Sequence, residues 1–482
     1  MNKRVDFFSS RWAFLLAAIG MAIGAGNIWR FPRLAGQYGG SFLIPWMTFL
    51  FLWSIPLIII EFSIGKKLRL GVIGAFYKGM GKKYSWMGWF VAGCTIGIMF
   101  YYSVVCGWSL KYFFLNINGS LDFTDYEKFW KYYTTGNFEP VIYSTISILI
   151  GCTIIYYGIR KGIEKTTKIM IPILFILLII AAIRAVTLPG AGQGLSYFFR
   201  IQTKDLLSYK VWLEALSQSA WSTGAGWGLI LTYANYVKKE EKIIKNSVLT
   251  GIGNNLASII CGLAIIPTVF ALSSSTDTAY AALQSGNQGL TFIYIPKLFA
   301  NMMGGKIFTL IFFMTLFIAA ISSLISMLEL SVHLLLDYNI LRKKAVIIVG
   351  VLTIIASIPS AYSLKFFNNQ DWVWGVGLLL SGLFFIFYVI KVKISEFIIR
   401  FLEYGGNSYV FHSWFPSFIV IFMIIEFIVM FLWWFFQSFN WYSSNWWDPF
   451  NDFTIGTCLM QWGILISTGW IFKKKIIKFN EI

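Results

Sequence analysis

Residues 11–32 read RWAFLLAAIGMAIGAGNIWRFP. The run from Trp12 is apolar and long enough to cross a bilayer, which takes about 20 such residues in a helix. However, Gly20, Gly24 and Gly26 interrupt it, and each glycine costs a helix interior roughly 1 kcal/mol relative to alanine. Unwound backbone at membrane depth persists only where it lines a cavity or binds a ligand. The stretch therefore predicts a spanning helix that is broken near its middle.

A second stretch, residues 217–228, reads SQSAWSTGAGWG and repeats the pattern with Gly224, Gly226 and Gly228. Close packing of neighbouring helices through small residues is the alternative for both stretches. The two stretches fall in spans one and six of the chain, which correspond if five spans are repeated. Broken helices at matching places in two halves are typical of a transporter's binding site. Freed carbonyls can then coordinate a cation, and a half-helix N-terminus can bind a carboxylate.

The whole chain has the composition of a polytopic membrane protein. Of its 482 residues, 57% are hydrophobic and 12% charged, whereas soluble domains carry roughly 25% charged residues. We expect an all-α fold with about twelve transmembrane helices in a single domain. The expected spans are 12–36, 42–65, 87–117, 141–158, 166–187, 211–237, 246–272, 307–337, 344–361, 372–392, 411–437 and 453–472.

The net charge of +18 lies mainly in short segments between apolar runs. The basic residues do not form one surface, which argues against nucleic acid as a partner. Cytoplasmic loops of membrane proteins are enriched in lysine and arginine. This asymmetry predicts a multi-pass protein of the cell membrane with both termini in the cytoplasm and with the lipid bilayer as its environment.

Uncharged polar residues cluster at the depth of the two breaks. They are Asn27, Gln218, Ser222, Asn254, Asn255, Ser322 and Ser323. Oxygen donors of this kind suit a hard, weakly held cation. Each one alone is more often a hydrogen bond between helices than a cation ligand.

Residues 11–32, with GGSFLIPW at 39–46 and IPLIIIEFSIG at 55–65, resemble the neurotransmitter:sodium symporter family. The likeness is strongest to its bacterial amino acid symporters of the leucine-transporter type. It implies an inverted repeat of helices 1–5 and 6–10, with repeats at about 8–190 and 205–395 and two further helices at about 408–475. It also implies that helices 1 and 6 are unwound at mid-membrane.

The resemblance implies two sodium sites. One would use the Ala22 carbonyl, Asn27, Ser222 and Asn254 together with the substrate carboxylate. The other would use the carbonyls of Gly20, Ile23 and Ala319 with the hydroxyls of Ser322 and Ser323. Serine stands at 222 and 322 where some relatives have threonine, and this keeps the oxygen ligand.

The resemblance also implies a substrate pocket. It would be formed by Ala22, Gly24, Ala25, Gly26, Ile98, Tyr102, Trp221, Ser222, Gly224, Trp227, Ser323 and Met327. Relatives that carry monoamines have an aspartate at the position of Gly24. Its absence favours a substrate with its own carboxylate, such as an α-amino acid. The resemblance then implies sodium-coupled import of a neutral L-amino acid by alternating access. The apolar wall favours a hydrophobic or aromatic side chain, and a small one is the alternative.

The family pattern assigns gates and a possible chloride site. Arg30 with Asp371 would close the outside, and Asp337 with an N-terminal basic residue and Tyr236 would close the inside. Arg4 is one residue away from the family register for that basic partner, and Phe8 replaces a family tryptophan. Gln218, Ser222, Asn254 and Ser258 resemble a chloride pocket, but Met47 replaces its tyrosine. Chloride then binds weakly, or an acid such as Glu329 or Glu61 supplies the charge.

Other functions find less support. The only histidines, His333 and His412, lack a metal or nucleophile motif, so we do not expect an enzyme. No filter-like sequence indicates a channel. A non-transporting amino acid sensor with the same pocket is the remaining alternative. No obligate protein partner is evident.

Overall fold

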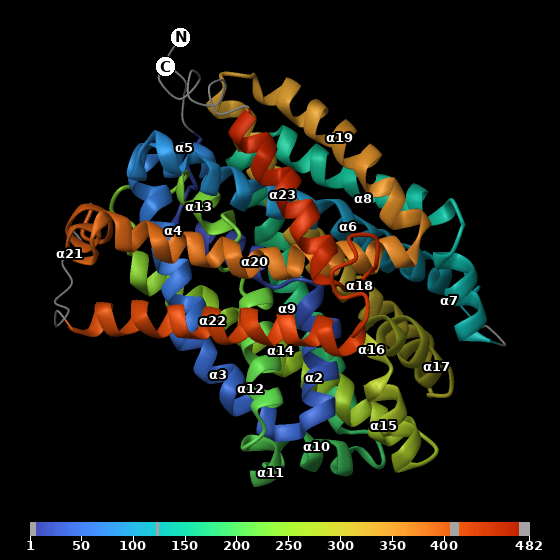
Figure 1. Cartoon of the computed structure of the whole chain (residues 1–482). Helices are drawn as coiled ribbons and strands as arrows, with labels where there is room; N and C mark the ends of the chain where they lie inside the picture. Colours follow the sequence, from blue (N-terminus) through green and yellow to red (C-terminus); the bar gives the residue numbers. More distant parts are fainter. Residues whose placement is uncertain (1–5, 122–124, 405–413, 472–482) are drawn as a thin grey trace.

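The computed structural model describes residues 6–121, 125–404 and 414–471, and these residues form a helical bundle without a strand. Nine described helical segments are long and apolar enough to cross a membrane, and shorter apolar helices accompany them. Figure 1 shows the helices packed around a common centre. The prediction of a polytopic all-α membrane protein is confirmed.

The first predicted break is present. Helix α1 covers Arg11–Ala22 and begins at Ser10, whose side chain accepts a hydrogen bond from the Ala13 backbone. The chain leaves the helix at Ile23, which is extended, and winds again in η1 (Gly26–Arg30) and α2 (Phe31–Tyr38). The predicted span 12–36 is therefore two helical pieces joined by a short unwound segment.

The second break has a direct conformational cause. Helix α12 (Tyr209–Ser222) and helix α13 (Leu229–Ala234) are separated by non-helical backbone. Gly224, Gly226 and Gly228 have φ of +68°, +84° and +79°. Residues with a Cβ rarely adopt such angles, so glycine is needed at all three positions.

Most of the other spans agree with the predicted ones to within a few residues, but the helix predicted at 372–392 begins eight residues earlier, at Leu364, and η5 extends the span predicted at 166–187 back to Ile159. These other spans are α3 (Leu43–Phe49) with η3 (Leu50–Ser54) and α4 (Ile55–Leu68), α6 (Ser85–Ile117), α8 (Glu139–Tyr156), η5 (Ile159–Glu164) with α9 (Lys165–Val186), α14 (Ile243–Leu272), α18 (Gly305–Asp337), α19 (Arg342–Tyr362), α20 (Leu364–Val392), α22 (Trp414–Trp441) and α23 (Ile455–Ile471). The start of the predicted span 411–437 lies outside the described residues.

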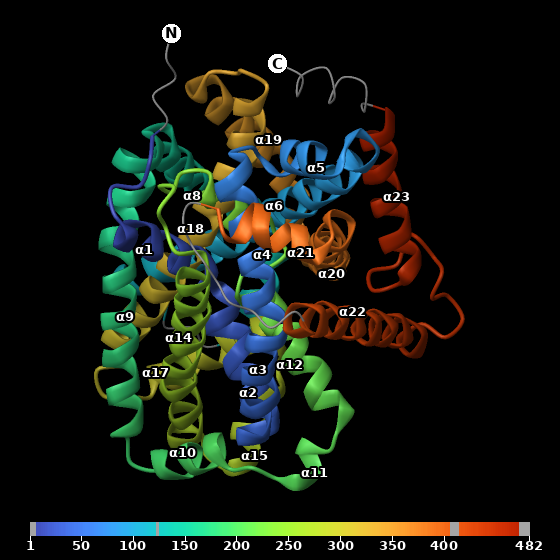
Figure 2. The same cartoon turned by 90° about the vertical axis from the view of Figure 1, so that its left-hand side faces the viewer.

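Short helices cap both ends of the bundle. In Figure 2, α5 lies near one end and α10, α11 and α15 near the other. The short elements are η2 (Gly39–Phe42), α5 (Val72–Met80), η4 (Lys82–Tyr84), α7 (Tyr126–Thr134), α10 (Ala191–Phe199), α11 (Thr203–Leu206), α15 (Thr276–Gln284), α16 (Gly286–Gln288), η6 (Gly289–Tyr294), α17 (Ile295–Ala300), α21 (Ile394–Phe397) and η7 (Ile398–Leu402).

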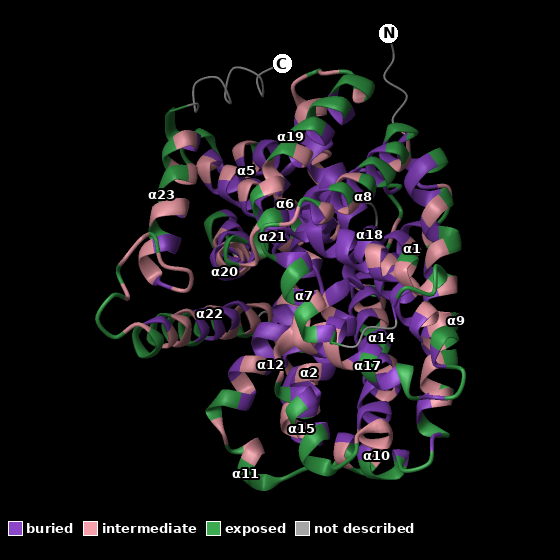
Figure 3. Ribbon diagram, turned by 90° about the vertical axis from the view of Figure 1, so that its right-hand side faces the viewer, coloured by how far each residue is buried: buried purple, intermediate pink, exposed green. Residues whose placement is uncertain are grey.

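Burial identifies the scaffold that holds the breaks. Helices α6 and α18 pack against each other and are buried over most of their length, whereas α9 exposes one side along its whole length (Figure 3). Exposed isoleucines and leucines on such outer faces suit lipid contact. The unwound segments of both broken spans therefore lie inside a ring of continuous helices.

Candidate functional site

A cavity of about 440 Å³ opens onto both helix breaks. Ten of the predicted pocket residues line it: Ala22, Gly24, Gly26, Tyr102, Trp221, Ser222, Gly224, Trp227, Ser323 and Met327. Ala25 and Ile98 are buried but do not line it. These ten residues are uncharged, and the lining also includes charged residues such as Arg30 and Asp371.

Gly24 lies where two polar side chains approach the unwound segment closely. A Cβ at this position would lie 2.7 Å from Tyr102 Oη and 2.9 Å from Ser323 Oγ. Tyr102 Oη accepts a hydrogen bond from the Ala25 backbone N–H at 2.8 Å. The Tyr102 hydroxyl is thus held against the unwound segment, where it can still donate its own hydrogen to a carboxylate.

An aromatic and thioether wall completes the inner cavity. The rings of Trp221 and Trp227 meet edge to face with centroids 5.4 Å apart. Gly224 has a positive φ, which favours glycine. A Cβ at this position would also lie 2.7 Å from Met21 Sδ, so glycine leaves room for the methionine. Rings and methionine favour an apolar or aromatic ligand group.

Oxygen atoms converge beside the cavity at Asn254. One end of its amide lies 2.8 Å from Asn27 Nδ2, 2.8 Å from the Ser222 carbonyl oxygen and 3.2 Å from the Ala22 carbonyl oxygen. Asn27 Oδ1 accepts from the Gly24 N–H at 3.0 Å, which turns Asn27 Nδ2 toward Asn254. The atom of Asn254 that accepts this hydrogen bond is then Oδ1.

The opposite orientation of the Asn254 amide would satisfy both carbonyls but would set two NH₂ groups against each other. With Oδ1 in place, three oxygens from Asn254, Ser222 and Ala22 face one point. Such an arrangement is unfavourable unless a cation lies among them. This geometry fits a sodium ion, although Asn27 Oδ1 itself points to Gly24.

A second group of oxygens joins α18 to the end of α1. Ser322 Oγ donates to the carbonyls of Gly20 at 2.7 Å and Ala319 at 2.9 Å. Ser323 Oγ donates to the Met21 carbonyl at 3.0 Å. Three of the ligands expected for the second ion, the carbonyls of Gly20 and Ala319 and the Ser322 hydroxyl, therefore lie together. Ser323 lies next to Ser322 in the chain, and Ile23 is the extended residue that follows α1.

The backbone freed by the second break is bound by side chains of three scaffold helices. Glu61 of α4 accepts from the Gly226 N–H at 2.6 Å. Thr95 of α6 donates to the Trp227 carbonyl at 2.6 Å, and Ser381 of α20 donates to the Gly226 carbonyl. The unwound segment therefore keeps its hydrogen bonds without water, as membrane depth requires.

The expected outer gate pair is not in direct contact. Arg30 and Asp371 line the same cavity, but no ion pair joins these two residues. Arg30 Nη2 instead donates to Ser217 Oγ at 2.6 Å, and its guanidinium lies 5.9 Å from the Trp221 ring centroid. This end of the cavity reaches α22, which contributes Trp433, Trp434 and Trp441.

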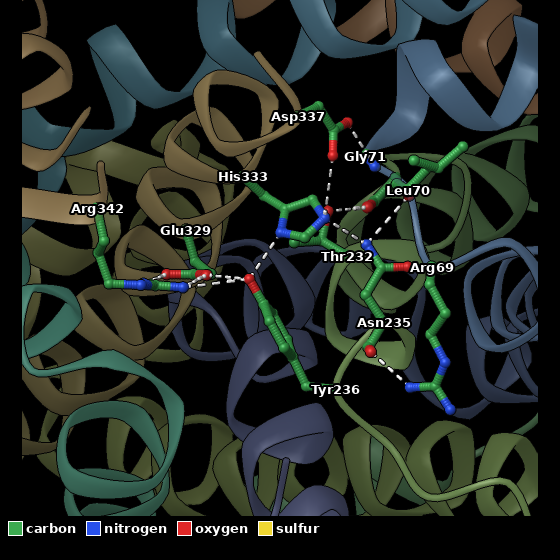
Figure 4. A network of polar contacts seen from close by, with 11 residues as sticks. Arg69, Leu70, Gly71, Thr232, Asn235, Tyr236, Glu329, His333, Asp337 and Arg342 are labelled. Atoms are coloured by element: carbon green, nitrogen blue, oxygen red, sulfur yellow. Dashed lines mark hydrogen bonds and ion pairs between the residues drawn. The ribbon is translucent and has the colours of Figure 1, made fainter. Parts of the chain in front are cut away.

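A buried polar network lies outside this lining and joins α18, α19 and the segment that follows α13 (Figure 4). Tyr236 donates to Glu329 Oε1 at 2.6 Å, and Arg342 binds both carboxylate oxygens of Glu329 at 2.7 and 2.8 Å. His333 lies 2.7 Å from Tyr236 Oη through Nδ1 and 2.8 Å from Asn235 Nδ2 through Nε2.

Asp337, expected to meet an N-terminal basic residue, accepts from the Gly71 N–H at 2.8 Å. Its Oδ1 lies 3.7 Å from His333 Nε2. Arg4, the basic residue nearest to the family position, lies outside the described residues. Phe8, which stands in place of the family tryptophan, is 2% exposed, and its N–H donates to the Tyr236 carbonyl.

The residues of the expected chloride pocket lie close together. Asn27 Nδ2 donates to Ser258 Oγ at 2.8 Å, and Asn254 Nδ2 donates to Ser222 Oγ at 3.2 Å. Gln218 Nε2 donates to the Gly26 carbonyl at 3.3 Å. The acids considered as substitutes are engaged elsewhere, since Glu61 binds the second break and Glu329 binds Arg342.

Sequence reasoning missed two contributions to these sites. The Glu329–Arg342 pair carried a signal, because ionisable residues within spans tend to pair with each other. The tryptophans of α22 carried none, since only the packing of α22 on α12 and α20 brings them to the cavity.

Comparison with known proteins places this geometry in context. The family model described as the sodium:neurotransmitter symporter family matches residues 5–141 and 134–474. An uncharacterized sodium-dependent transporter of Methanocaldococcus jannaschii is 34% identical over 73% of this chain and 74% of its own length. One of Haemophilus influenzae is 30% identical over 72% of this chain and 78% of its own.

A solved structure shares the fold. The crystal structure of MhsT in complex with L-phenylalanine matches with a TM-score of 0.77 at 29% identity and covers 89% of this chain and 99% of its own. The relatives are sodium-dependent transporters and not enzymes. The chain belongs to the sodium:neurotransmitter symporter family of multi-pass membrane transporters.

Proposed function

We propose that this sodium-dependent symporter imports a neutral L-amino acid with a hydrophobic or aromatic side chain by alternating access. The observation that carries the proposal is that Ala22 and Ser222 serve two sites. Both line the central cavity, and the carbonyls of both converge with Asn254 Oδ1 on the candidate cation position. A ligand carboxylate that enters this cavity can then bind the cation. This contact couples the binding of the amino acid to the binding of sodium.

The chemistry of the inner cavity supports an amino acid. At Gly24 no carboxylate is available to meet a ligand amine, and the Tyr102 hydroxyl can donate to a ligand carboxylate. The half-helix that begins at Gly26 starts beside this hydroxyl, and the N-terminus of a helix favours an anion such as the same carboxylate. The tryptophan and methionine wall leaves room for an apolar side chain, and the similar structure of MhsT holds L-phenylalanine.

The two ends of the molecule support alternating access. The cavity reaches Arg30 and Asp371, which form no direct pair, whereas its lining does not include Phe8, Tyr236 or the Glu329–Arg342 pair. We infer that this arrangement faces outward, with both termini in the cytoplasm and the protein in the cell membrane. Two sodium ions, one beside Asn254 and one beside Ser322, fit the oxygen groups, and chloride has a polar but incomplete pocket.

Uptake of labelled L-phenylalanine into proteoliposomes tests the proposal. We expect accumulation with an inward sodium gradient and none when potassium replaces sodium outside. Competition identifies the side chain that the pocket prefers, and the competitors are leucine, tyrosine, tryptophan, alanine and glycine. Replacing chloride by gluconate tests whether uptake requires chloride. Binding without accumulation under any gradient would instead support the sensor alternative.

A matched pair of variants tests the second ion group. Ser323→Ala removes a hydroxyl at the end of α1 and should raise the sodium concentration that gives half-maximal uptake. Ser331→Ala removes a hydroxyl from the same helix. Among the described residues, this hydroxyl donates hydrogen bonds to the Met327 carbonyl and to Met99 Sδ. The variant should therefore leave the half-maximal sodium concentration unchanged. Equal effects of the two variants would refute a sodium role for Ser323.

A further inference from the structure

A second cavity, of about 510 Å³, lies at the corner where α8, η5 and α9 meet. Its lining is strongly basic: Tyr157, Arg160, Lys161, Glu164, Lys165 and Lys168. Arg160, Lys161 and Lys165 are exposed and make no ion pair with any described residue. The corner therefore holds positive charge that the chain itself does not neutralise.

The two nearest carboxylates are already engaged. Glu164, 3% exposed, accepts from Lys168 Nζ at 2.6 Å and from the Ser9 N–H at 2.8 Å, and it also contacts the Ser9 hydroxyl. Asp6 Oδ2 accepts from the backbone N–H groups of Ile159 and Arg160 at 2.9 and 3.0 Å. Both acids fasten the N-terminal segment to η5, so the remaining cations face an open cavity.

The same face of α9 continues as an exposed apolar stripe. Lys165 is followed by Ile169, Ile176 and Ile183, which are 55%, 55% and 59% exposed. These four positions lie within about 40° of one another around the helix and extend along about 27 Å of it, close to the thickness of a hydrocarbon core. Figure 2 shows α9 at the outer edge of the bundle beside α8 and α1.

We propose that this corner binds an anionic phospholipid. The headgroup phosphate lies in the basic cavity between Arg160, Lys161 and Lys165, and an acyl chain follows the isoleucine stripe of α9. Basic pockets between spanning helices are suited to anionic headgroups, and the exposed Tyr157 beside the cavity suits the membrane interface. Because Asp6 and Ser9 are anchored on the same turn, the bound lipid also steadies the N-terminal segment against η5.

Thermal unfolding of the full-length protein in neutral detergent tests the site and requires no transport. Phosphatidylglycerol, phosphatidylcholine or inorganic phosphate is titrated, and the midpoint temperature is followed. We expect saturable stabilisation by phosphatidylglycerol alone. Each cation near an anionic surface contributes about a fivefold factor, so Lys161→Gln with Lys165→Gln should raise the half-saturating lipid concentration about thirtyfold.

A control carries the same loss of charge elsewhere. Lys83→Gln with Lys393→Gln removes two exposed lysines outside the cavity and should leave the phosphatidylglycerol titration unchanged. Equal loss in both double variants would mean that surface charge alone acts, and the proposal would be wrong. Equal stabilisation by phosphatidylcholine, or by inorganic phosphate at matched concentration, would also overturn it. Because the readout is binding, failure here is separate from failure of amino acid transport.

Discussion

Substitution of Gly24 by alanine is the sharpest test of the central site. The added Cβ would lie 2.7 Å from Tyr102 Oη and 2.9 Å from Ser323 Oγ, closer than such atoms approach in proteins. At least one of these side chains must then move. Both are committed, because Tyr102 Oη accepts from the Ala25 N–H and Ser323 donates to the Met21 carbonyl.

The size of the effect follows from the hydrogen bond that is lost. If the Tyr102 hydroxyl retreats, it can no longer donate to the ligand carboxylate, and a hydrogen bond to a charged group contributes about 1.5–3 kcal/mol. We therefore expect the affinity for L-phenylalanine to fall roughly 10- to 150-fold. If Ser323 retreats instead, the half-saturating sodium concentration rises as well.

Equilibrium binding of labelled L-phenylalanine to purified protein in sodium measures both effects. Gly192→Ala in α10 is the control, because it makes the same change outside the cavity, where a Cβ would meet nothing within 4 Å. It should bind nearly as the wild type does. The reasoning is refuted if Gly24→Ala binds normally, or if the two variants weaken binding equally while both remain folded by thermal unfolding.

Two further predictions concern stability. Arg342→Met leaves the fully buried Glu329 carboxylate without its partner and should destabilise the protein by about 3–5 kcal/mol. Thermal unfolding in detergent measures this loss, and the double variant Glu329→Gln with Arg342→Met should recover much of it. No recovery in the double variant would contradict the pairing. Gly226→Ala places a Cβ at φ +84° and 3.1 Å from Gly382 Cα, which should cost at least about 1–2 kcal/mol. Gly463→Ala in α23, where a Cβ meets nothing within 4 Å, should keep or raise the midpoint temperature, and an equal fall in both glycine variants would contradict the conformational argument.

The sequence predicted the features that depend on local conformation. Gly224, Gly226 and Gly228 were expected to break a span, and their positive φ values give the physical reason. The position of Gly24 beside Tyr102 and Ser323 followed from the family pattern, and the cavity places all three together.

Features that depend on the relation between distant helices were not predictable in the same way. Arg30 was expected to pair with Asp371, but it binds Ser217, because the relative position of η1 and α20 decides which partner is within reach. Tyr236 was expected at the inner gate, yet its partners Glu329 and Arg342 come from two other helices. The hydrophobic pattern of a single sequence predicts where each helix lies along the chain, but it does not identify the helices that pack against it.

The anchored break between α12 and α13 has a mechanical consequence. Glu61, Thr95 and Ser381 fix this segment to three helices, so it can serve as a pivot with two unequal arms. The arm α12, with 14 residues, is about 21 Å long, and α13, with 6 residues, is about 9 Å long. A rotation of about 10° moves the tip of the long arm by about 4 Å and that of the short arm by less than half as much. If the two arms tilt together, the end of the bundle beside α12 opens far more than the end beside α13, and α1, which packs against α13, is then the element that has to move separately.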